Sequence, residues 1–276
     1  MVDKNKEGEL RVLLYDLETS PNLVWTWGVW EQNAIKVVIP RQIISFSWKW
    51  LGEKEVHTLA LSDTKSYKAA WKAGKRTWFD DELRNNRELM TKLHDLFMEA
   101  DVTIGHNVEQ FDDKRTYTDF VKNKLAPVPP HRRVDTLKFA RSKFDFNSNK
   151  LDDLGEFLGL GRKVKHPGFE MWNGCMNGDK VSWAQLKLYN AGDVVLLENI
   201  YLLLRPWMAI HPNMNAGDGN LGCPKCRGKN MDPHRRRMTQ AGQKLQYRCR
   251  DCWSYCTVLL EKPSKKSAVS VIRKYV

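Results

Sequence analysis

Four cysteines near the C-terminus form two C-x-x-C pairs, and they constrain the fold more than any other feature of the sequence. The pairs read C-P-K-C and C-R-D-C and are separated by 22 residues. Zn²⁺ takes four soft ligands at tetrahedral corners, and a two-residue gap lets one tight turn present two thiolates to the same ion. We therefore predict a zinc ribbon over residues 221–260, with one structural Zn²⁺ held by Cys223, Cys226, Cys249 and Cys252.

Two further cysteines lie outside these pairs. Cys256 is close enough to Cys252 in the sequence to be a substitute ligand, but we interpret it as a strand residue packed in the small core of the ribbon. Cys175 stands alone and is interpreted as an ordinary thiol. Disulfides are disfavoured, because the N-terminal stretch MVDKNKEGELR lacks the apolar run of a secretory signal. We expect a cytoplasmic protein that is not secreted.

Positive charge is concentrated in the last quarter of the chain. The 276 residues carry a formal net charge of +12, and the segment from His211 onward holds 14 Lys or Arg against 4 Asp or Glu. Aromatic residues alternate with these cations around the predicted ribbon, a pattern typical of modules that hold phosphates and stack bases. Docking to another protein is the alternative. The cations predicted to contact nucleic acid are Arg235, Arg236, Arg237 and Lys244.

The order of the predicted elements indicates an α/β fold. We expect an antiparallel meander of strands at 11–17, 23–29, 43–50 and 55–61, followed by helices that alternate with two short strands. The result is a mixed sheet flanked by helices. The short strands are expected at 102–107 and 132–136, and the helices at 81–100, 109–123, 137–143, 151–159 and 183–205, the last with Ser182 as its N-cap.

Domain boundaries follow from composition. Residues 11–207 form the first predicted domain, the turn-rich stretch 208–220 a linker, and residues 261–276 a basic tail after the ribbon. No apolar run approaches the roughly 20 residues that span a bilayer, so we expect no membrane association.

Several tryptophans lie outside the expected core strands. Residues 63–80 are predicted to leave the core, and there Trp71 and Trp78 could stack a single strand beside neighbouring lysines. The alternative, which we favour, is a solvated loop whose tryptophans cover the sheet edge. The three tryptophans of the second strand region are expected to pack inside the protein; they are Trp25, Trp27 and Trp30.

Four carboxylates are candidates for a second metal site. Asp16 and Glu18 are two residues apart at the end of the first strand, so both point to the same face. Asp112 lies at the start of a helix, and Asp193 lies on the last long helix, four residues after Tyr189. Each carboxylate alone has an ordinary structural explanation. Together they would repel unless a cation joined them, and oxygen ligands suit Mg²⁺ or Mn²⁺.

Three motifs in order give these acids a context: Y-D-L-E-T at 15–19, G-H-N-V-E-Q-F-D at 105–112 and Y-N-A-G-D at 189–193. They resemble the exonuclease motifs of the DEDD superfamily of 3′–5′ exonucleases, and the Tyr of the third motif resembles the Y-type branch. Residues 11–207 are similar as a whole to predicted exonucleases of phages and bacteria that are related to the proofreading domain of family B DNA polymerases.

The resemblance implies a ribonuclease H-like fold and a two-metal centre. Asp16 would bridge the two ions, and Tyr189 would orient the attacking water. The residues that would hold the two Mg²⁺ or Mn²⁺ ions are Asp16, Glu18, Asp112 and Asp193.

The motifs also suggest substrate contacts. Asn107 is either the substrate-contacting Asn of the second motif or the N-cap of the following helix. Phe111 is interpreted as a core residue rather than a stacking platform. Leu17 and Thr19 are candidates to lie along the terminal nucleotide, and His106 is interpreted as structural because hard metal ions prefer oxygen.

These observations predict a metal-dependent 3′–5′ exonuclease that releases nucleoside 5′-monophosphates, with DNA, and single strands in particular, expected as substrate. The ribbon would tether the enzyme to nucleic acid and raise its effective concentration there. A replication or recombination protein is a further expected partner. The alternatives are a structure-specific endonuclease on the same fold and a non-catalytic zinc-ribbon protein that binds nucleic acid.

Overall fold

A computed structural model describes residues 10–30, 33–215, 222–239 and 242–259. The chain divides into two compact units: residues 11–203 form one, and the described residues from Leu204 onward, with Leu10, belong to the other. The predicted basic tail at 261–276 and residues 216–220 of the predicted linker lie outside the described residues.

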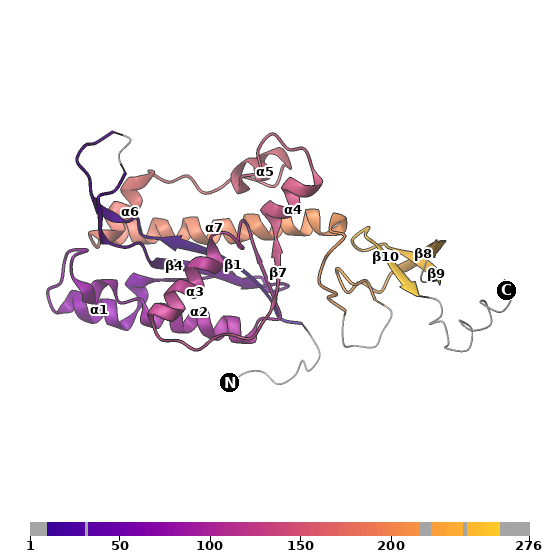
Figure 1. The fold of residues 1–276 in the computed structure, drawn as a ribbon, viewed down its shortest axis with the longest axis horizontal. Coiled ribbons are helices and arrows are strands. Elements are labelled where there is room, and N and C mark those ends of the chain that lie inside the picture. The colour runs from indigo at the N-terminus through magenta and orange to yellow at the C-terminus, as the bar shows by residue number, and fades with distance from the viewer. Residues whose placement is uncertain (1–9, 31–32, 216–221, 240–241, 260–276) are drawn as a thin grey trace, which may run out of the picture. The chain divides into compact units, whose positions relative to one another are not determined.

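The larger unit is built on one mixed five-stranded sheet with the order β5-β4-β1-β6-β7. β4 pairs antiparallel with both β1 and β5, whereas β6 pairs parallel with both β1 and β7. This arrangement, flanked by helices, confirms the predicted α/β class (Figure 1). The strands are β1 (Val12–Thr19), β4 (Ile43–Trp50), β5 (His57–Ala60), β6 (Val102–Gly105) and β7 (Arg132–Asp135).

The alternation of side chains along β1 separates two layers of the core. Leu13, Tyr15 and Leu17 pack in a cluster with α2 (Arg87–Glu99) and α3 (Asp112–Lys122). The side chains between them face the opposite side, because successive residues of a strand point to opposite faces. On that side lies the 25-residue helix α7 (Lys180–Leu204), drawn in orange in Figure 1. Asp16 and Glu18 therefore face α7.

Two shorter helices join α7 on its side of the sheet. α1 (Lys65–Lys72) and α6 (Phe169–Met176) contribute Tyr67 and Met171 to the cluster that also holds Trp183 of α7. The remaining helices of the larger unit are α4 (Thr136–Lys143) and α5 (Leu151–Phe157), with 3₁₀ turns at Leu61–Asp63 and Asp81–Arg84.

The predicted excursion at 63–80 proves to be structured. Its first half forms α1, where the hydroxyl of Thr64 accepts a hydrogen bond from the Tyr67 N–H and caps the helix. Trp78 is only 7% exposed and belongs to the core cluster, with Trp71 packed against it. The expectation of a solvated loop was wrong, because the aromatic residues among the lysines supply an apolar side that docks on the sheet layer.

The second predicted strand was also placed wrongly. β2 (Leu23–Trp25) is short and pairs with β3 (Lys36–Ile39) in a separate two-stranded sheet rather than joining the meander. Its tryptophans are not packed inside: Trp27 is 89% exposed and Trp30 is 83% exposed, and Trp25 is also exposed. The apolar alternation was read correctly as a strand, but no layer covers it.

Two helix boundaries differ from the expectation. The segment 81–100 is interrupted, with a 3₁₀ turn before α2 begins at Arg87. The last long helix begins at Lys180 rather than 183. The Asp179 carboxylate accepts hydrogen bonds from the N–H groups of Val181 (3.3 Å) and Ser182 (2.8 Å). Asp179 is therefore the N-cap of α7. Ser182, which was expected to be the cap, lies in the first turn of the helix.

The smaller unit contains a three-stranded antiparallel sheet with the order β10-β9-β8. Its strands are β8 (Met231–Thr239), β9 (Gly242–Cys249) and β10 (Tyr255–Leu259), and a 3₁₀ turn at Arg205–Trp207 follows α7. Cys223, Cys249 and Cys252 form its buried centre. Among the helices that the structure describes, none combines the length and apolarity needed to cross a membrane.

The contrast between the tryptophans gives a stability prediction. Trp78→Ala should lower the free energy of unfolding by about 3–5 kcal/mol, because it empties a packed core site. Trp27→Ala should change it by less than about 0.5 kcal/mol, because the side chain is exposed. Urea unfolding of both variants checks this, and comparable destabilisation by the two substitutions would contradict the placement of β2.

Candidate functional site

Three of the predicted carboxylates meet between β1 and α7. Each of Asp16, Glu18 and Asp193 offers one carboxylate oxygen, and these three oxygens all lie within 4.8 Å of one another. The first two come from the same face of β1, and the third comes from the middle of α7, more than 170 positions later in the chain. We call this group the acid cluster.

Asp112, the fourth predicted acid, borders the cluster without joining it. It is the first residue of α3 and is buried. Burial raises the pKa of its carboxyl well above the usual value, and the nearby charge of Asp16 raises it further. The structure thus brings Asp112 within electrostatic reach of Asp16 but outside the compact group of three.

Electrostatics in the cluster favour a bound cation. Burial and, secondly, the charge of Asp193 raise the pKa of Asp16 from its usual 3.8 to about 7. Burial also raises the pKa of Glu18, with Asp16 as the next cause. Burial raises the pKa of Asp193 as well, although Lys163 opposes this. Like charges gathered in a partly buried group are costly unless a cation neutralises them, so the cluster favours a bound cation.

Lys163 supplies part of the missing positive charge. Its Nζ donates hydrogen bonds to Asp193 Oδ2 at 2.6 Å and to the Tyr189 hydroxyl at 2.9 Å. Burial opposes the charged form, but Asp193 outweighs it and the pKa of Lys163 is raised. The loop that carries Lys163 is held in place because Asp152 accepts a hydrogen bond from the Lys163 backbone N–H at 2.7 Å.

Asn190 orients the central acid. Its Nδ2 donates to Asp16 Oδ2 at 2.7 Å and to the Asp16 carbonyl at 3.2 Å, while its Oδ1 accepts from Ser45 Oγ of β4 at 3.1 Å. Asn190 is fully buried. One amide therefore connects α7 to two adjacent strands and fixes the Asp16 carboxylate.

Gly192 lets the lysine loop approach α7. A Cβ atom at this position would lie 2.8 Å from Cγ2 of Val164, the residue next to Lys163. A side chain at Gly192 would push the loop away from the helix, so the absence of one helps Lys163 to reach Asp193.

The sequence analysis did not identify Lys163, Asn190 or Gly192 as residues of the site. Asn190 had a usable signal, since it lies three residues before Asp193 and hence on the same face of the helix. Gly192 lay inside the third motif but was given no role. Lys163 had no signal beyond being basic, because its loop is about 30 residues from Asp193 in sequence.

The donor set fits a divalent metal. Asp112 Oδ1 and Asp193 Oδ1 are buried and have no hydrogen-bond partner among the described residues. A buried carboxylate oxygen without a partner is costly, whereas hard oxygen ligands are what Mg²⁺ and Mn²⁺ prefer. Asp16, Glu18 and Asp193, with Asp112 beside them, are the residues that would hold such ions.

Tyr189 lies one helical turn before Asp193, as expected from the spacing. Burial raises the pKa of its phenol to about 12, and the charge of Asp193 adds to this. The phenol therefore stays protonated at neutral pH and can donate a hydrogen bond.

The second-motif residues lie near the acids but differ in detail from the expectations. Asn107 has a positive φ of 66°, and its N–H donates to Asp135 Oδ1 at 3.0 Å. Because α3 begins only at Asp112, Asn107 is not its N-cap, and that alternative was wrong. Phe111, expected in the core, is half-buried, and the Arg41 guanidinium lies 5.7 Å from its ring centroid.

Two β1 residues predicted to line a nucleotide differ in exposure. The Leu17 side chain is buried in the cluster with α2, and its backbone makes a hydrogen bond to the Asp112 carboxylate. Thr19, at the end of β1, is half-buried. His106 is structural: its ring nitrogens lie 2.9 Å from Thr136 Oγ1 and from the Asn149 carbonyl oxygen. Burial lowers its pKa to about 4.

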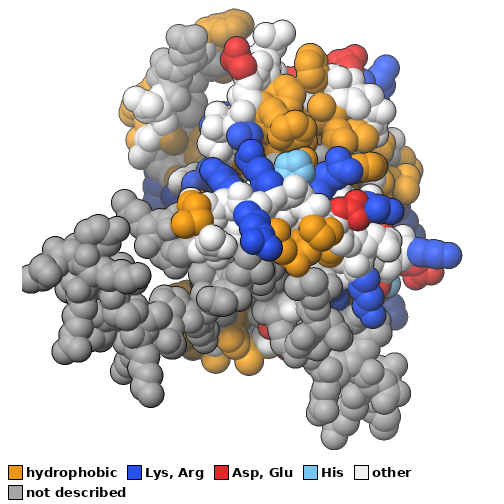
Figure 2. Space-filling model, turned by 90° about the vertical axis from the view of Figure 1, so that its right-hand side faces the viewer, with side chains coloured by type: hydrophobic (Ala, Val, Ile, Leu, Met, Phe, Trp, Pro, Cys, Tyr) orange, Lys and Arg blue, Asp and Glu red, His pale blue; other side chains and the backbone are white. Residues whose placement is uncertain are grey.

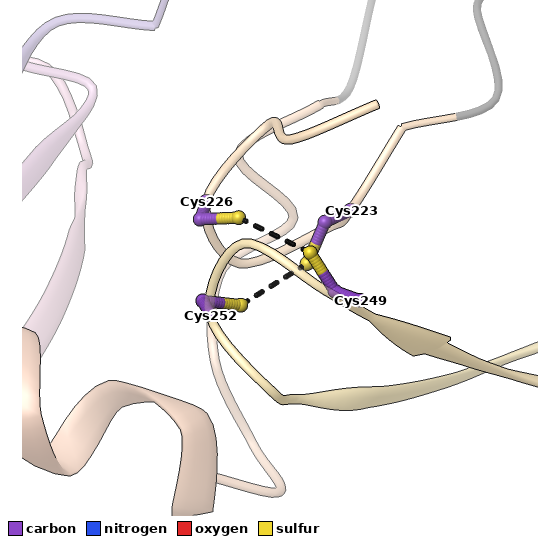
Figure 3. Close-up of side chains that lie close together, drawn as sticks. All are labelled: Cys223, Cys226, Cys249 and Cys252. Carbon is purple, nitrogen blue, oxygen red and sulfur yellow. Dashed lines mark hydrogen bonds between the residues drawn. The ribbon is translucent and has the colours of Figure 1, made fainter. Parts of the chain in front are cut away.

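The four predicted zinc ligands form a compact group in the smaller unit. Their sulfur atoms all lie within 4.8 Å of one another, with Cys223 and Cys252 Sγ 3.7 Å apart and Cys226 and Cys249 Sγ 3.6 Å apart (Figure 3). Zn–S bonds of about 2.3 Å at tetrahedral angles place sulfurs about 3.8 Å apart. The four cysteines therefore have the geometry of a zinc site.

Both cysteine turns have the same backbone form. Arg227 N–H donates to the Cys223 carbonyl and Trp253 N–H donates to the Cys249 carbonyl, each at 2.9 Å, and both donors have positive φ. Burial opposes ionisation of Cys223, but hydrogen bonds, first that of Ser254, lower its pKa to about 7. A thiolate at this position favours metal binding.

Cys256 lies outside the group of four. It belongs to β10, where it pairs with Tyr247 of β9, and it is half-buried. This agrees with its interpretation as a strand residue. Cys175, by contrast, is buried in the larger unit among the residues around α1 and α7.

The four basic residues predicted to contact nucleic acid lie on strands of the smaller unit. Arg235, Arg236 and Arg237 are exposed on β8, and Lys244 lies opposite Arg237 on β9. Only Arg235 has a polar side-chain partner among the described residues here, with its Nε 3.0 Å from Gln246 Oε1. Figure 2 shows Lys and Arg side chains interspersed with hydrophobic ones among the side chains that face the viewer.

Many solved structures are similar to this chain, and a DNA polymerase is among them. The family B DNA polymerase from the hyperthermophilic archaeon Pyrobaculum calidifontis aligns with a TM-score of 0.49 and 17% sequence identity. The alignment covers 73% of this chain and 26% of that polymerase, so the chain spans about a quarter of its neighbour's length. No protein-family model matches the sequence, and no curated protein matches it.

The acid cluster predicts a pH-dependent response to metal. A raised carboxyl pKa means that the folded protein holds protons which the unfolded chain releases. This contribution to stability is present below the usual value of 3.8 and is lost as pH rises through about 7. Millimolar Mn²⁺ should therefore raise Tm more at about pH 8 than at about pH 5.5, because it binds ionised carboxylates.

Calorimetry of the wild type and of Asp16→Asn/Asp193→Asn measures this shift. The double variant should respond little to Mn²⁺ at either pH. An equal response of both proteins would show that the metal binds elsewhere.

The cysteine group predicts one bound zinc per chain. Cys249→Ser should lose the zinc and destabilise the smaller unit, because three ligands hold the ion less tightly than four. Cys256→Ser is the matched control and should keep the metal. Elemental analysis of the purified variants checks both outcomes, and zinc loss in the control would assign Cys256 to the ligand set.

Proposed function

We propose that residues 11–207 form a metal-dependent 3′–5′ exonuclease domain of the DEDD superfamily, Y-type, with a ribonuclease H-like fold. It would hydrolyse the terminal phosphodiester of single-stranded DNA and release nucleoside 5′-monophosphates. The observation that carries this proposal is the meeting of Asp16, Glu18 and Asp193, contributed by the first and third motifs, within 4.8 Å.

A purely structural role for the acid cluster is difficult to reconcile with its energetics. Like charges buried together destabilise the fold, and Lys163 is the one cation that hydrogen-bonds Asp193 among the described residues. Groups with strongly perturbed pKa values are concentrated at functional sites. The cluster therefore supports a role in binding cations and reacting groups.

In the proposed reaction, Asp16, Glu18, Asp112 and Asp193 hold the two Mg²⁺ or Mn²⁺ ions. When bound, ions of this kind lower the pKa of water and stabilise charge on the leaving oxygen. Asn190 keeps the Asp16 carboxylate in one orientation through its 2.7 Å hydrogen bond. This fixed geometry limits the reorganisation needed when substrate binds.

Tyr189 and Lys163 would act on the substrate side of the cluster. The protonated phenol of Tyr189 can donate to the attacking water and orient it. The Lys163 ammonium, 2.9 Å from that phenol, can stabilise negative charge on the phosphate as it develops. Asn107, Thr19 and Phe111 are the remaining candidates for contact with the terminal nucleotide.

The second unit would serve as a zinc ribbon over 221–260, joined by the linker 208–220. Its exposed arginines would bind phosphates, and the ribbon would raise the local concentration of substrate without taking part in the chemistry. A replication or recombination protein is a further proposed partner.

End-labelling tests the activity directly. Wild-type protein with Mn²⁺ should release labelled mononucleotides at once from a single strand labelled at its 3′ end. From an internally labelled strand, labelled products should appear only later. Asp16→Asn and Asp193→Asn should each lower the rate at least about 100-fold, as expected when a reactive group loses its electrostatic support. Early internal fragments would favour an endonuclease, and no product under any condition would favour a binding protein.

Charge removal tests the ribbon. Replacing Arg235, Arg236 and Arg237 by Gln should raise KM and reduce the salt dependence of single-strand binding by about 0.7 in log–log slope for each lost phosphate contact. Turnover of saturating short oligonucleotides should change little. Lys54→Gln/Lys92→Gln, at two exposed lysines of the larger unit, is the control. A large fall in kcat would place the ribbon in the reaction.

A further inference from the structure

A cavity of about 350 Å³ lies between α1 and the start of α7, separate from the acid cluster. Its size falls in the range of pockets that hold small ligands, roughly 300–1,000 Å³. Three aromatic residues and four lysines line it. The aromatic residues are Tyr67, Trp71 and Trp183, and the lysines are Lys68, Lys72, Lys180 and Lys187.

The aromatic side chains form a fixed apolar floor. Tyr67 and Trp183 are buried, and their rings pack edge to face at 6.0 Å. The Trp71 ring lies nearly parallel to that of Tyr67, with an interplanar angle of 9°. Gly178 allows this position, because a Cβ there would lie 2.2 Å from the Trp71 ring. The aromatic lining is therefore pre-formed, with the Trp71 ring parallel to that of Tyr67 and the Trp183 ring nearly perpendicular to it.

The rim of the cavity is positive. No Asp or Glu is among the residues that line it. Lys187 pairs with Asp63 at 2.9 Å, and Lys68 donates to the Asp63 carbonyl at 2.7 Å. Among the described residues, no acidic side chain pairs with Lys72 or Lys180. These two cations are free to bind an anion at the mouth of the cavity.

An aromatic floor and a cationic rim together select one class of ligand. An inorganic anion would use the lysines but not the floor, and a neutral aromatic compound would use the floor but not the lysines. A nucleobase stacks on aromatic side chains regardless of sequence, and its phosphate pairs with lysines. We propose that this cavity binds a nucleoside phosphate, either as a free mononucleotide or as one nucleotide of a single strand.

The cavity is distinct from the acid cluster but connected to it. Trp183 and Asp193 lie on the same helix, ten residues or about 15 Å apart along its axis. Trp183 and Tyr189 belong to one buried cluster. A ligand in the cavity would therefore lie near the start of the helix whose middle carries Asp193. The proposal goes beyond hydrolysis and does not depend on it.

Residues 63–80 contribute to the lining of the cavity. Trp78 is buried and cannot stack a ligand, but Trp71 and two of the lysines of that segment line the cavity. The partners that complete it, Trp183 and Lys180, come from α7.

Binding is measured in buffer without added Mg²⁺ or Mn²⁺, so that the acid cluster cannot hold phosphate through such an ion while the cysteine group keeps its zinc. Isothermal titration calorimetry with dAMP and with a short oligo-dT should show binding by the wild type. Lys72→Glu/Lys180→Glu should weaken it at least about tenfold, since both exposed cations become repulsive. Deoxyribose 5-phosphate should bind at least about fivefold more weakly than dAMP, because it lacks the stacking base.

Lys54→Glu/Lys92→Glu is the charge-matched control and should bind like the wild type. Trp71→Leu, with its fold verified by Tm, should weaken dAMP but not deoxyribose 5-phosphate. Loss of both ligands in the cavity variant supports a site open to free nucleotides, and loss of the oligonucleotide alone supports a strand-binding site. Equal binding by the cavity and control variants, or no binding by the wild type, overturns the proposal. None of these results depends on hydrolysis, which the Asp16→Asn variant tests separately.

Discussion

The repulsion among the partly buried carboxylates between β1 and α7 is the constraint on which the arrangement of the larger unit depends. The strand period of two puts Asp16 and Glu18 on the same side of β1, and α7 adds Asp193 to that side. Such a group is unfavourable unless cations and hydrogen bonds stabilise it. Lys163 supplies a cation to Asp193, and Asn190 supplies a hydrogen bond to Asp16. The close approach at Gly192 lets the loop of Lys163 reach the helix.

The opposite face of β1 shows why this arrangement is tolerated. Leu13, Tyr15 and Leu17 alternate with the acids and pack against α2, so the strand is anchored by apolar burial on one side. The unfavourable interactions among the acids on the other side of β1 can then be tolerated without loss of the fold. The cysteine group of the smaller unit differs, because there the side chains that would bind metal also form the buried centre.

Local patterns predicted some features and failed at others for the same physical reason. A mixed sheet flanked by helices, the last long helix and the cysteine pairs were predicted from periodicity and spacing, although the expected second strand does not join that sheet. The burial of the tryptophans could not be predicted in this way. Trp78 is buried, whereas Trp27 is exposed, although both lie in aromatic stretches between polar residues. What separates them is whether a layer from elsewhere in the chain covers the stretch, and a local pattern contains no information on that.

By itself, the sequence determined which chemistry is available: the order of the acids, the C-x-x-C spacing and the alternation that points Asp16 and Glu18 the same way. Only the tertiary structure decided which residues meet them. Lys163 reaches Asp193 and Asn190 reaches Asp16 across 30 and 174 positions of sequence. Trp71 and Trp183 share a cavity that neither segment forms alone. Spacing fixes neighbours on one element, whereas contacts between elements depend on how the whole chain packs.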